Sequence, residues 1–239
     1  MSKGIVISLY DYTGEALKPW AMNGYECYAF DIQHTSNAME WFYSDDGVYG
    51  NIRYRYADLH DYDTHREIFK EFNHKRVVFG MAFPVCTDLA VSGAAWFKRK
   101  EEANPGFQDE AVQHAIDCEH LFWHLDCPYF IENPVSVLAT KWRKPDYSFH
   151  PYEYGEYIPD DEAEHPRWPD YIAPKDAYTK KTCLWTSESF RMPHRLPTCK
   201  PNGYSAQHLK LGGKSQRTKD IRSATPRGFA TAVYEFNRA

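Results

Sequence analysis

Short apolar runs alternate with helical segments along most of this 239-residue chain. The runs are rich in β-branched and aromatic residues and span 4–10, 25–30, 51–56, 76–82, 129–131 and 182–186. Apolar residues recur with helical spacing in segments 16–23, 63–72 and 109–125. A chain that alternates in this way buries its strands between two layers of helices. The pattern therefore predicts an α/β fold with a doubly wound, mostly parallel sheet.

Four of the predicted strands are followed within a few residues by a polar side chain that could serve a functional site. These residues are Asp31, Asp58, Cys86 and Glu132. Ligands of a doubly wound sheet bind outside the carboxyl ends of its strands, so the four side chains should lie along one edge. Carboxylates after the second and third strands suit the ribose hydroxyls and the adenine amino group of a nucleoside. Each acid alone could equally be a solvated loop residue, and the shared position is what favours a site.

Cys86 and Glu132 are the candidates for covalent and proton-transfer chemistry. A cysteine in a loop can act as a nucleophile when its pKa is lowered, although a buried cysteine is more commonly inert. Glu132 ends a buried strand, where partial burial would raise the pKa of its carboxyl and make it a proton donor. It could also simply cap the loop that begins at Pro134.

The chain divides into a main domain, a short basic segment and a C-terminal element. Residues 1–186 are predicted to form a catalytic and cofactor-binding α/β domain. A surface insertion at about 144–177, rich in proline, tyrosine and acidic residues, interrupts this domain. Residues 187–222 form the basic segment, which is long enough for only a small module. Residues 223–239 are expected to return to the main domain.

Charge is distributed unevenly along the chain. Residues 1–178 carry a net charge of −14 and residues 179–239 a net charge of +9. The basic quarter indicates an anionic partner, or else a basic face that offsets the acidic body. No apolar run approaches the roughly 20 residues of a membrane span, so no membrane partner is expected. The six cysteines are scattered, which favours a cytoplasmic chain with reduced thiols over a disulfide framework.

Two short motifs carry the candidate nucleophile and the candidate acid. Phe83-Pro84-Val85-Cys86 is followed by Ser92-Gly93, six and seven residues after the cysteine, and Glu132-Asn133-Pro134 follows the next helix. These motifs resemble the nucleophile loop and the Glu-Asn-Val triplet of the 5-methylcytosine DNA methyltransferases. That family uses S-adenosyl-L-methionine and has the class I methyltransferase (Rossmann-like) fold. The resemblance implies the same fold, the same cofactor and a DNA substrate for this chain.

Other motifs of the family stand in the same order along the chain. Residues 9–14 are similar to the first cofactor loop. Asp31 matches the acid that holds the ribose, and Asp58 matches the acid near the adenine. Residues 178–182 stand where the family has a Gln-x-Arg-x-Arg run, and residues 223–226 resemble the final cofactor motif.

The resemblance implies a role for each matching residue. The catalytic residues would be Cys86, Glu132 and Lys180. The cofactor would contact Tyr10, Asp11, Gly14, Asp31, Ile32, Asp58, Leu59, Pro84, Ser223 and Thr225. The DNA substrate would contact Thr87, Ser92, Asn133, Lys214, Arg217 and Arg222. No metal is expected in this chemistry.

The chain departs from the family pattern at several positions, and because of these departures we consider three functions. Val85 separates Pro84 from Cys86, and Lys180 replaces an arginine. Tyr12 stands where small residues normally let the cofactor approach. Besides methyl transfer to cytosine C5 in DNA, we consider C5 modification of another pyrimidine substrate (nucleotide or RNA) or with an altered sulfonium cofactor, and a catalytically inactive protein that binds DNA or a partner. A protein partner could supply specificity, and the compact size suggests a phage gene expressed in a bacterial host cell.

Overall fold

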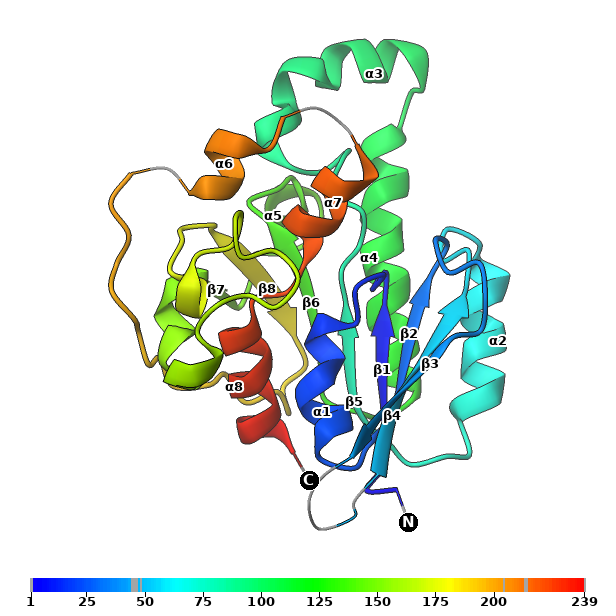
Figure 1. Cartoon of the computed structure of the whole chain (residues 1–239). Helices are drawn as coiled ribbons and strands as arrows, with labels where there is room; N and C mark the ends of the chain where they lie inside the picture. The colour runs from blue at the N-terminus through cyan, green and yellow to red at the C-terminus, as the bar shows by residue number, and fades with distance from the viewer. Residues whose placement is uncertain (1, 44–46, 48, 204, 213–214, 239) are drawn as a thin grey trace.

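The computed structural model describes residues 2–43, 47, 49–203, 205–212 and 215–238. Within these residues, eight strands form one sheet in the order β3-β4-β2-β1-β5-β6-β8-β7 (Figure 1). The strands are β1 (Ile5–Leu9), β2 (Glu26–Asp31), β3 (Met39–Tyr43), β4 (Tyr49–Tyr56), β5 (Val77–Ala82), β6 (Tyr129–Pro134), β7 (Tyr147–Phe149) and β8 (Thr182–Thr186). The α/β class and the mostly parallel sheet predicted from the sequence are confirmed.

The central strands form a parallel sheet with a topological switch point. The parallel strands lie across the sheet in the order β4, β2, β1, β5, β6. When only these five strands are numbered along the chain, the order is 3-2-1-4-5, which nucleotide-binding doubly wound sheets share. Antiparallel strands flank them, because β3 pairs with β4 and β8 pairs with both β6 and β7. The direction in which the chain adds strands reverses between β1 and β5, and a crevice forms at such a point outside the carboxyl ends of the strands. The loops after β1 and β5 therefore border this crevice.

Helices cover both faces of the sheet (Figure 1). The α-helices are α1 (Lys18–Met22), α2 (Tyr62–Phe72), α3 (Phe97–Ala103), α4 (Phe107–His124), α5 (Leu138–Lys141), α6 (Ala206–Lys210), α7 (Gln216–Ser223) and α8 (Arg227–Asn237). Phe72 of α2 and Phe122 of α4 are buried in one core cluster, while Trp20 of α1 and Phe229 of α8 are buried in another. None of the helices in the described part of the chain is long and apolar enough to cross a membrane.

The segment that the sequence predicted as a surface insertion, residues 144–177, also contributes to the core. Short 3-10 helices occur in the chain at η1 (Glu15–Leu17), η2 (Val91–Trp96), η3 (Pro151–Tyr157), η4 (Asp160–Glu162) and η5 (Pro174–Asp176). Three of these, together with strand β7, belong to the segment. Its Tyr154 is fully buried and packs edge-on against Phe149 and Phe229, with centroid distances of 5.5 and 5.2 Å. The segment thus adds an edge strand and buried aromatic residues to the domain.

A third, smaller core lies between this segment and the basic helices. Its buried residues are Trp168, Ile172, Tyr178, Leu211, Ile221 and Ala224. Polar contacts reinforce it, since the Lys210 ammonium donates to the Asp170 carbonyl at 2.8 Å and the Arg217 guanidinium lies 5.3 Å from the centre of the Tyr171 ring. Helices α6 and α7 therefore pack on the chain between 168 and 178.

Candidate active site

The loop after β5 presents Cys86 at the carboxyl edge of the sheet. Pro84 is buried, whereas Val85 and Cys86 are exposed. The amides of Leu89 and Ala90 donate to the Cys86 carbonyl at 3.1 and 2.8 Å, which closes a turn after the cysteine. The additional residue Val85 is thus accommodated on the surface of the loop, and the cysteine remains accessible at the switch point.

A buried hydrogen bond fixes this loop to the end of β6. Asn133 is 1% exposed, and its Nδ2 donates to the Pro84 carbonyl at 3.0 Å. Leaving a buried polar group without its partner costs about 1 to 3 kcal/mol, so this contact constrains the loop. The motif that carries Cys86 and the motif that carries Glu132 are therefore joined directly.

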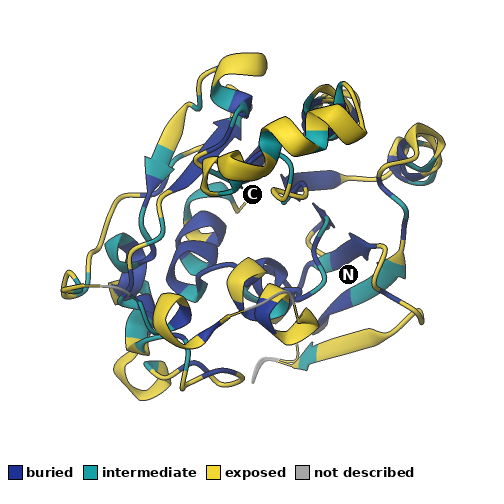
Figure 2. Cartoon of the chain, turned by 90° about the horizontal axis from the view of Figure 1, so that it is seen from above, coloured by how far each residue is buried: buried dark blue, intermediate teal, exposed yellow. Residues whose placement is uncertain are grey.

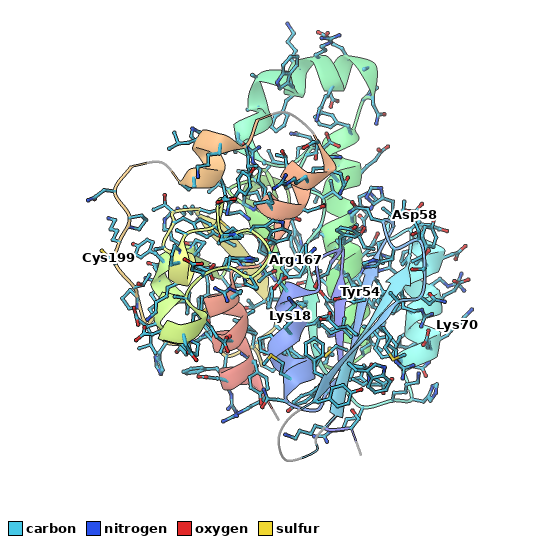
Figure 3. All side chains as sticks on the ribbon, viewed as in Figure 1. Lys18, Tyr54, Asp58, Lys70, Arg167 and Cys199 are labelled. Atoms are coloured by element: carbon cyan, nitrogen blue, oxygen red, sulfur yellow. The ribbon has the colours of Figure 1, made fainter. Side chains whose placement is uncertain are left out.

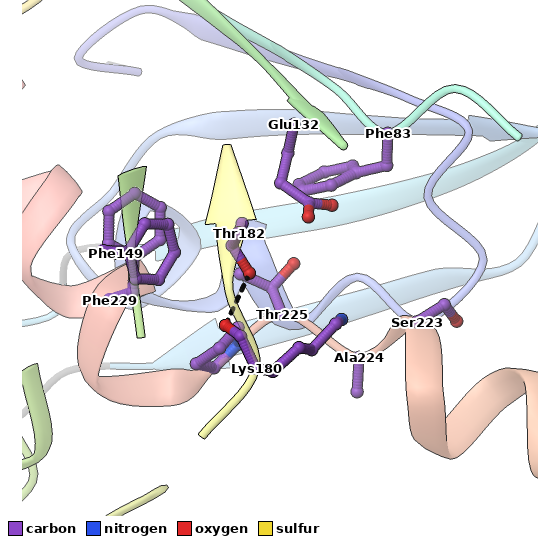
Figure 4. A pocket seen from close by; sticks show the side chains of 10 residues that line it. Phe83, Glu132, Phe149, Lys180, Thr182, Ser223, Ala224, Thr225 and Phe229 are labelled. Atoms are coloured by element: carbon purple, nitrogen blue, oxygen red, sulfur yellow. Dashed lines mark hydrogen bonds between the residues drawn. The ribbon is translucent and has the colours of Figure 1, made fainter. Parts of the chain in front are cut away.

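Glu132 and Lys180 line a pocket at the same edge, and their charged groups point into the same space as the Thr225 hydroxyl (Figure 4). Lys180 lies two residues before the start of β8, and its ammonium donates to the Arg222 carbonyl at 2.9 Å. One oxygen of Glu132, Oε1, is buried and has no hydrogen-bond partner among the described residues. Because a buried acceptor without a partner is costly, this carboxyl suits a ligand group that donates or shares a proton.

Burial and neighbouring charges set the protonation of the site. Burial raises the pKa of the Glu132 carboxyl, and the positive charge of Lys180 partly offsets this effect. Although Cys86 has exposed surface, the protein atoms packed around it desolvate its thiol and raise the pKa, the negative charge of Glu132 raises this pKa further, and Lys180 lowers it. Both charges thus act on the thiol, although Cys86 itself is not among the residues that line the pocket. The thiol is protonated in the resting protein near pH 7, so thiolate formation depends on the charges beside it.

The ends of β2 and β4 offer groups that suit a nucleoside. The Oδ1 atom of Asp31 accepts from the amide and the side chain of Gln33 at 2.8 and 3.1 Å, and Oδ2 receives no hydrogen bond from any residue that the structure describes. Asp58 is half-buried and accepts from the His60 amide at 3.1 Å. Ile32, beside Asp31, has a side chain that is 54% exposed. A carboxylate oxygen for ribose hydroxyls and an apolar surface for a base are therefore both present.

The loop after β1 is shaped by its own side chains. Asp11 is buried, with Oδ2 accepting from the Ser8 hydroxyl and Oδ1 accepting from the Gly14 amide, both at 2.8 Å. Gly14 has a φ of 69°, and a Cβ at this position would lie 2.6 Å from the Tyr54 hydroxyl oxygen. The Tyr54 side chain, which comes from β4 (Figure 3), thus fills the space beside this glycine. The Asp31 and Asp58 carboxyls could serve a nucleoside, whereas the Asp11 carboxyl is directed into its own loop.

The remaining predicted cofactor residues lie around these loops. Ser223 and Thr225 both line the pocket, and the exposed Ser223 hydroxyl donates to the Asp220 carbonyl at 3.3 Å. The Tyr10 hydroxyl donates at 2.8 Å to the carbonyl of Leu59, whose side chain is buried. This bond ties the loop after β1 to the loop after β4. The Pro84 carbonyl accepts the hydrogen bond from Asn133.

The predicted substrate residues are spread over several elements. Thr87 and Ser92 are exposed in the chain that follows the nucleophile loop. Asn133 is buried and makes the hydrogen bond that joins the two motifs. Arg217 and Arg222 are exposed on α7, whose last residue lines the pocket. Lys214 lies outside the described residues.

Aromatic side chains that the sequence did not single out complete the pocket. Phe83, Phe149 and Phe229 line it, and the rings of Phe149 and Phe229 stack with centroids 4.0 Å apart. Thr182, at the start of β8, lies beside them (Figure 4). Phe83 belongs to the nucleophile motif and could have been chosen from it. Phe149 and Phe229 carry no such signal, because an aromatic residue that lines a pocket looks in sequence like any core residue.

No protein-family model matches the chain, and no curated protein matches its sequence significantly. The site itself therefore indicates the function. It combines an accessible thiol, a buried carboxyl with an unpartnered oxygen and a lysine ammonium beside the switch point. Such a set can form and break a covalent bond to a ligand, exchange a proton with it and offset charge as that bond forms.

Proposed function

We propose that this protein transfers a methyl group from S-adenosyl-L-methionine to C5 of cytosine in DNA through a covalent adduct at Cys86. The observation that carries the proposal is the junction of the Cys86 loop with the Glu132 triplet, held by the 3.0 Å hydrogen bond between Asn133 and Pro84. The opposite effects of Glu132 and Lys180 on the pKa of the Cys86 thiol support it further. Cytosine C5 is a poor nucleophile, and the addition of a thiolate at C6 makes it reactive.

In the proposed reaction Cys86 is the nucleophile and Glu132 holds the base. The thiolate adds to C6, and the electrons of the C5–C6 double bond make C5 a nucleophilic carbon. C5 would take the methyl group, and the electrons of the broken sulfur–methyl bond would stay on the former sulfonium sulfur, which leaves as a neutral thioether. The C5 proton is then lost to solvent, the electrons of the C5–H bond restore the double bond, and the bond between the Cys86 sulfur and C6 breaks to release the thiolate. Glu132 contacts N3 and the amino group, and a raised pKa suits it because a protonated carboxyl can donate to N3. Lys180 favours the thiolate through its positive charge.

S-adenosyl-L-methionine, when bound, supplies an electrophilic methyl group on a sulfonium sulfur. In this proposal Asp31 contacts the ribose hydroxyls, Asp58 the adenine amino group and Ile32 the adenine ring. Thr225 and Ser223 lie on the pocket side of the same crevice. The parallel strand order supports the assignment, because doubly wound sheets of this order bind nucleotides at the switch point. The fold would then be the class I methyltransferase fold.

DNA is the proposed substrate because of the charge around the pocket. Helices α6 and α7 expose a group of basic side chains, which are Lys210, Arg217, Lys219 and Arg222. They belong to the C-terminal quarter, whose net charge is +9. Lysine and arginine side chains neutralise phosphates and so position a duplex without reading its sequence. A base within that duplex must leave its stack to reach Cys86.

Trapping the adduct tests the proposal. Duplex DNA in which 5-fluorocytosine replaces cytosine cannot lose the C5 substituent, so the covalent complex should accumulate when S-adenosyl-L-methionine is added. We expect an adduct that survives denaturing electrophoresis in the wild type and is abolished in Cys86→Ser. Cys199→Ser is the matched control, because Cys199 is also an exposed cysteine but lies at the edge of the molecule in Figure 3, and it should form the adduct normally.

Other outcomes assign the chain to a different function. Transfer of a labelled methyl group to RNA or free nucleotides, and not to DNA, would favour another pyrimidine substrate. Cofactor binding without any adduct would favour a catalytically inactive protein. An adduct that persists in Cys86→Ser would contradict the proposed nucleophile.

A further inference from the structure

A helical arm rises from the loop that carries Cys86. The arm comprises residues 91–106 and contains η2 and α3, and neither of these helices has a buried residue. In Figure 1 it extends beyond the carboxyl edge of the sheet as the uppermost part of the molecule. A segment without buried side chains contributes little to the core, so its sequence is free to serve a surface function.

The arm exposes a tryptophan at the junction of its two helices. Trp96 is 60% exposed, and among the described residues its indole has no hydrogen-bond or ring partner. Val91, which is 50% exposed, and the exposed Ala94 and Ala95 surround it in sequence, so the start of the arm is apolar. Large exposed aromatic side chains that gather with other apolar residues mark interaction surfaces.

The base of the arm is fixed to the candidate active site. The Lys100 ammonium donates to the Thr87 carbonyl at 3.2 Å and forms an ion pair with Asp88, one and two residues after Cys86. The Val91 amide donates to the Val135 carbonyl at 3.1 Å, just beyond the Glu132 triplet. The arm is thus anchored to both motifs, so Trp96 has a defined position relative to Cys86.

Basic side chains on the arm and on α7 favour nucleic acid as the partner. Lys98 and Arg99 follow Trp96 on α3 and are exposed, and Arg217 and Lys219 are exposed on α7. Seen from above the sheet (Figure 2), exposed helices stand on both sides of the strand ends. Positive side chains on two sides of an edge complement a polyanion that lies across it.

We infer that Trp96 is an apolar wedge that enters a DNA duplex beside the target cytosine and fills the space that the extruded base leaves. This inference rests on the proposed function and adds to it a residue that positions the base. Extrusion costs stacking and pairing energy, and apolar side chains that insert between bases offset that cost. An indole is suited to the role because it can stack on the neighbouring bases. Single-stranded DNA needs no wedge, because its bases are already free to turn outward.

Comparing duplex with heat-denatured DNA tests the wedge. Tritium transfer from labelled S-adenosyl-L-methionine to linear plasmid DNA is measured in both forms for each variant of the full chain. We expect the methyl-transfer rate of Trp96→Ala to be about tenfold or more below the wild-type rate on the duplex, and less than about threefold below it on the denatured DNA. Trp96→Phe, which keeps an aromatic ring, should recover most of the duplex rate. Trp123→Ala is the matched control, since Trp123 is 69% exposed on α4 and lies outside the arm.

The outcomes separate the wedge from the proposed activity. Equal losses on both forms of DNA, or no loss on the duplex, would overturn the wedge while leaving methyl transfer in place. A Trp123→Ala variant as impaired as Trp96→Ala would also overturn it, because the effect would not be specific to the arm. If the wild type transfers no label to either form, the proposed function fails and the wedge fails with it.

Discussion

Two neighbouring charges act in opposite directions on the pKa of the Cys86 thiol. Burial and the negative charge of Glu132 raise the pKa of the thiol, while the positive charge of Lys180 lowers it. Neutralising the Glu132 carboxyl, or engaging it with a ligand, would therefore remove one of the two effects that raise the pKa of the thiol. Such a thiol is protected from adventitious reaction when no substrate is present.

This arrangement predicts the reactivity of Cys86 in the free protein. In a Cys199→Ser background, the alkylation rate of Cys86 by iodoacetamide should rise as the pH increases above neutrality, since only the thiolate reacts. Glu132→Gln should increase the rate at neutral pH because it removes a negative charge, and Lys180→Met should decrease it. Mass spectrometry of the labelled peptide measures all three. Identical rates in the three proteins would show that these charges do not act on the thiol.

We expect the stability of the protein to depend on pH because of the buried carboxyl of Asp176. Its carboxyl is 1% exposed and accepts from the Gly228 amide at 3.0 Å, and burial raises its pKa from 3.8 to about 6. The folded protein then binds this proton more tightly than the unfolded chain does, so the contribution to stability is fully present below about pH 4 and is lost as the pH rises through about 6. The total loss corresponds to roughly 3 kcal/mol. Asp176→Asn should lack it.

Urea unfolding of the wild type and of Asp176→Asn across this range isolates the effect. The wild type should lose up to about 3 kcal/mol of its free energy of unfolding relative to the variant between about pH 4 and pH 7. A difference between the two proteins that stays constant with pH would contradict the prediction.

At the scale of elements, the close approach of the 144–177 segment to α8 makes this contact sensitive to substitution. A Cβ on Gly228, in the first turn of α8, would lie 2.2 Å from the Tyr154 carbonyl oxygen. Gly228→Ala should therefore force the two elements apart and cost about 1 to 3 kcal/mol of the free energy of unfolding. Gly212→Ala is the control, since a Cβ there meets no atom of the described residues within 4 Å, and it should change stability by less than about 0.5 kcal/mol. Urea unfolding of both variants checks this difference.

The sequence allowed the central strands to be predicted because their local pattern is strong. Strands β1, β2 and β5 are short runs of buried β-branched and aromatic residues with turn residues on either side. Strand β3 was missed because its residues are largely exposed at the sheet edge, and β7 because it has only three residues. The antiparallel direction of β8 also has no local signal, since it depends on how the 144–177 segment returns the chain to the sheet.

The candidate site shows the same limit. Cys86 and Glu132 could be chosen from the sequence because polar residues at strand ends are unusual enough to attract attention. The direction of a side chain could not be chosen in this way. Asp11 turns into its own loop because Ser8 and the Gly14 amide provide hydrogen-bond donors there. Tyr54 fills the space beside Gly14 because β4 lies next to β2 in the sheet, which is a long-range contact.

At the scale of the whole molecule, charge is divided between the acidic body and the basic C-terminal quarter. If α7 faces phosphates, the affinity for duplex DNA should fall steeply with salt, because each phosphate contact releases a counterion. The double variant Arg217→Ala, Lys219→Ala should reduce the slope of log affinity against log salt by about 2. Fluorescence anisotropy with a labelled duplex measures this slope.

A lysine on another side of the molecule provides the control for this measurement. Lys70 is exposed on α2, away from α6 and α7 (Figure 3). Lys70→Ala removes one positive charge from the chain without changing the basic helices, so the slope should stay the same. A slope that changes equally in both proteins would show that net charge, and not α7, controls binding.

The separate core beneath α6 and α7 gives these helices an opening equilibrium of their own. None of its buried residues belongs to the two clusters that pack on the sheet. A cluster this small can separate and re-form while the sheet stays intact. In amide hydrogen exchange, the protons of α7 should therefore exchange through a local opening, much faster than those of β1, which exchange only when the whole domain unfolds. The exchange rate of α7 then reports the binding of a partner, with β1 as the internal reference.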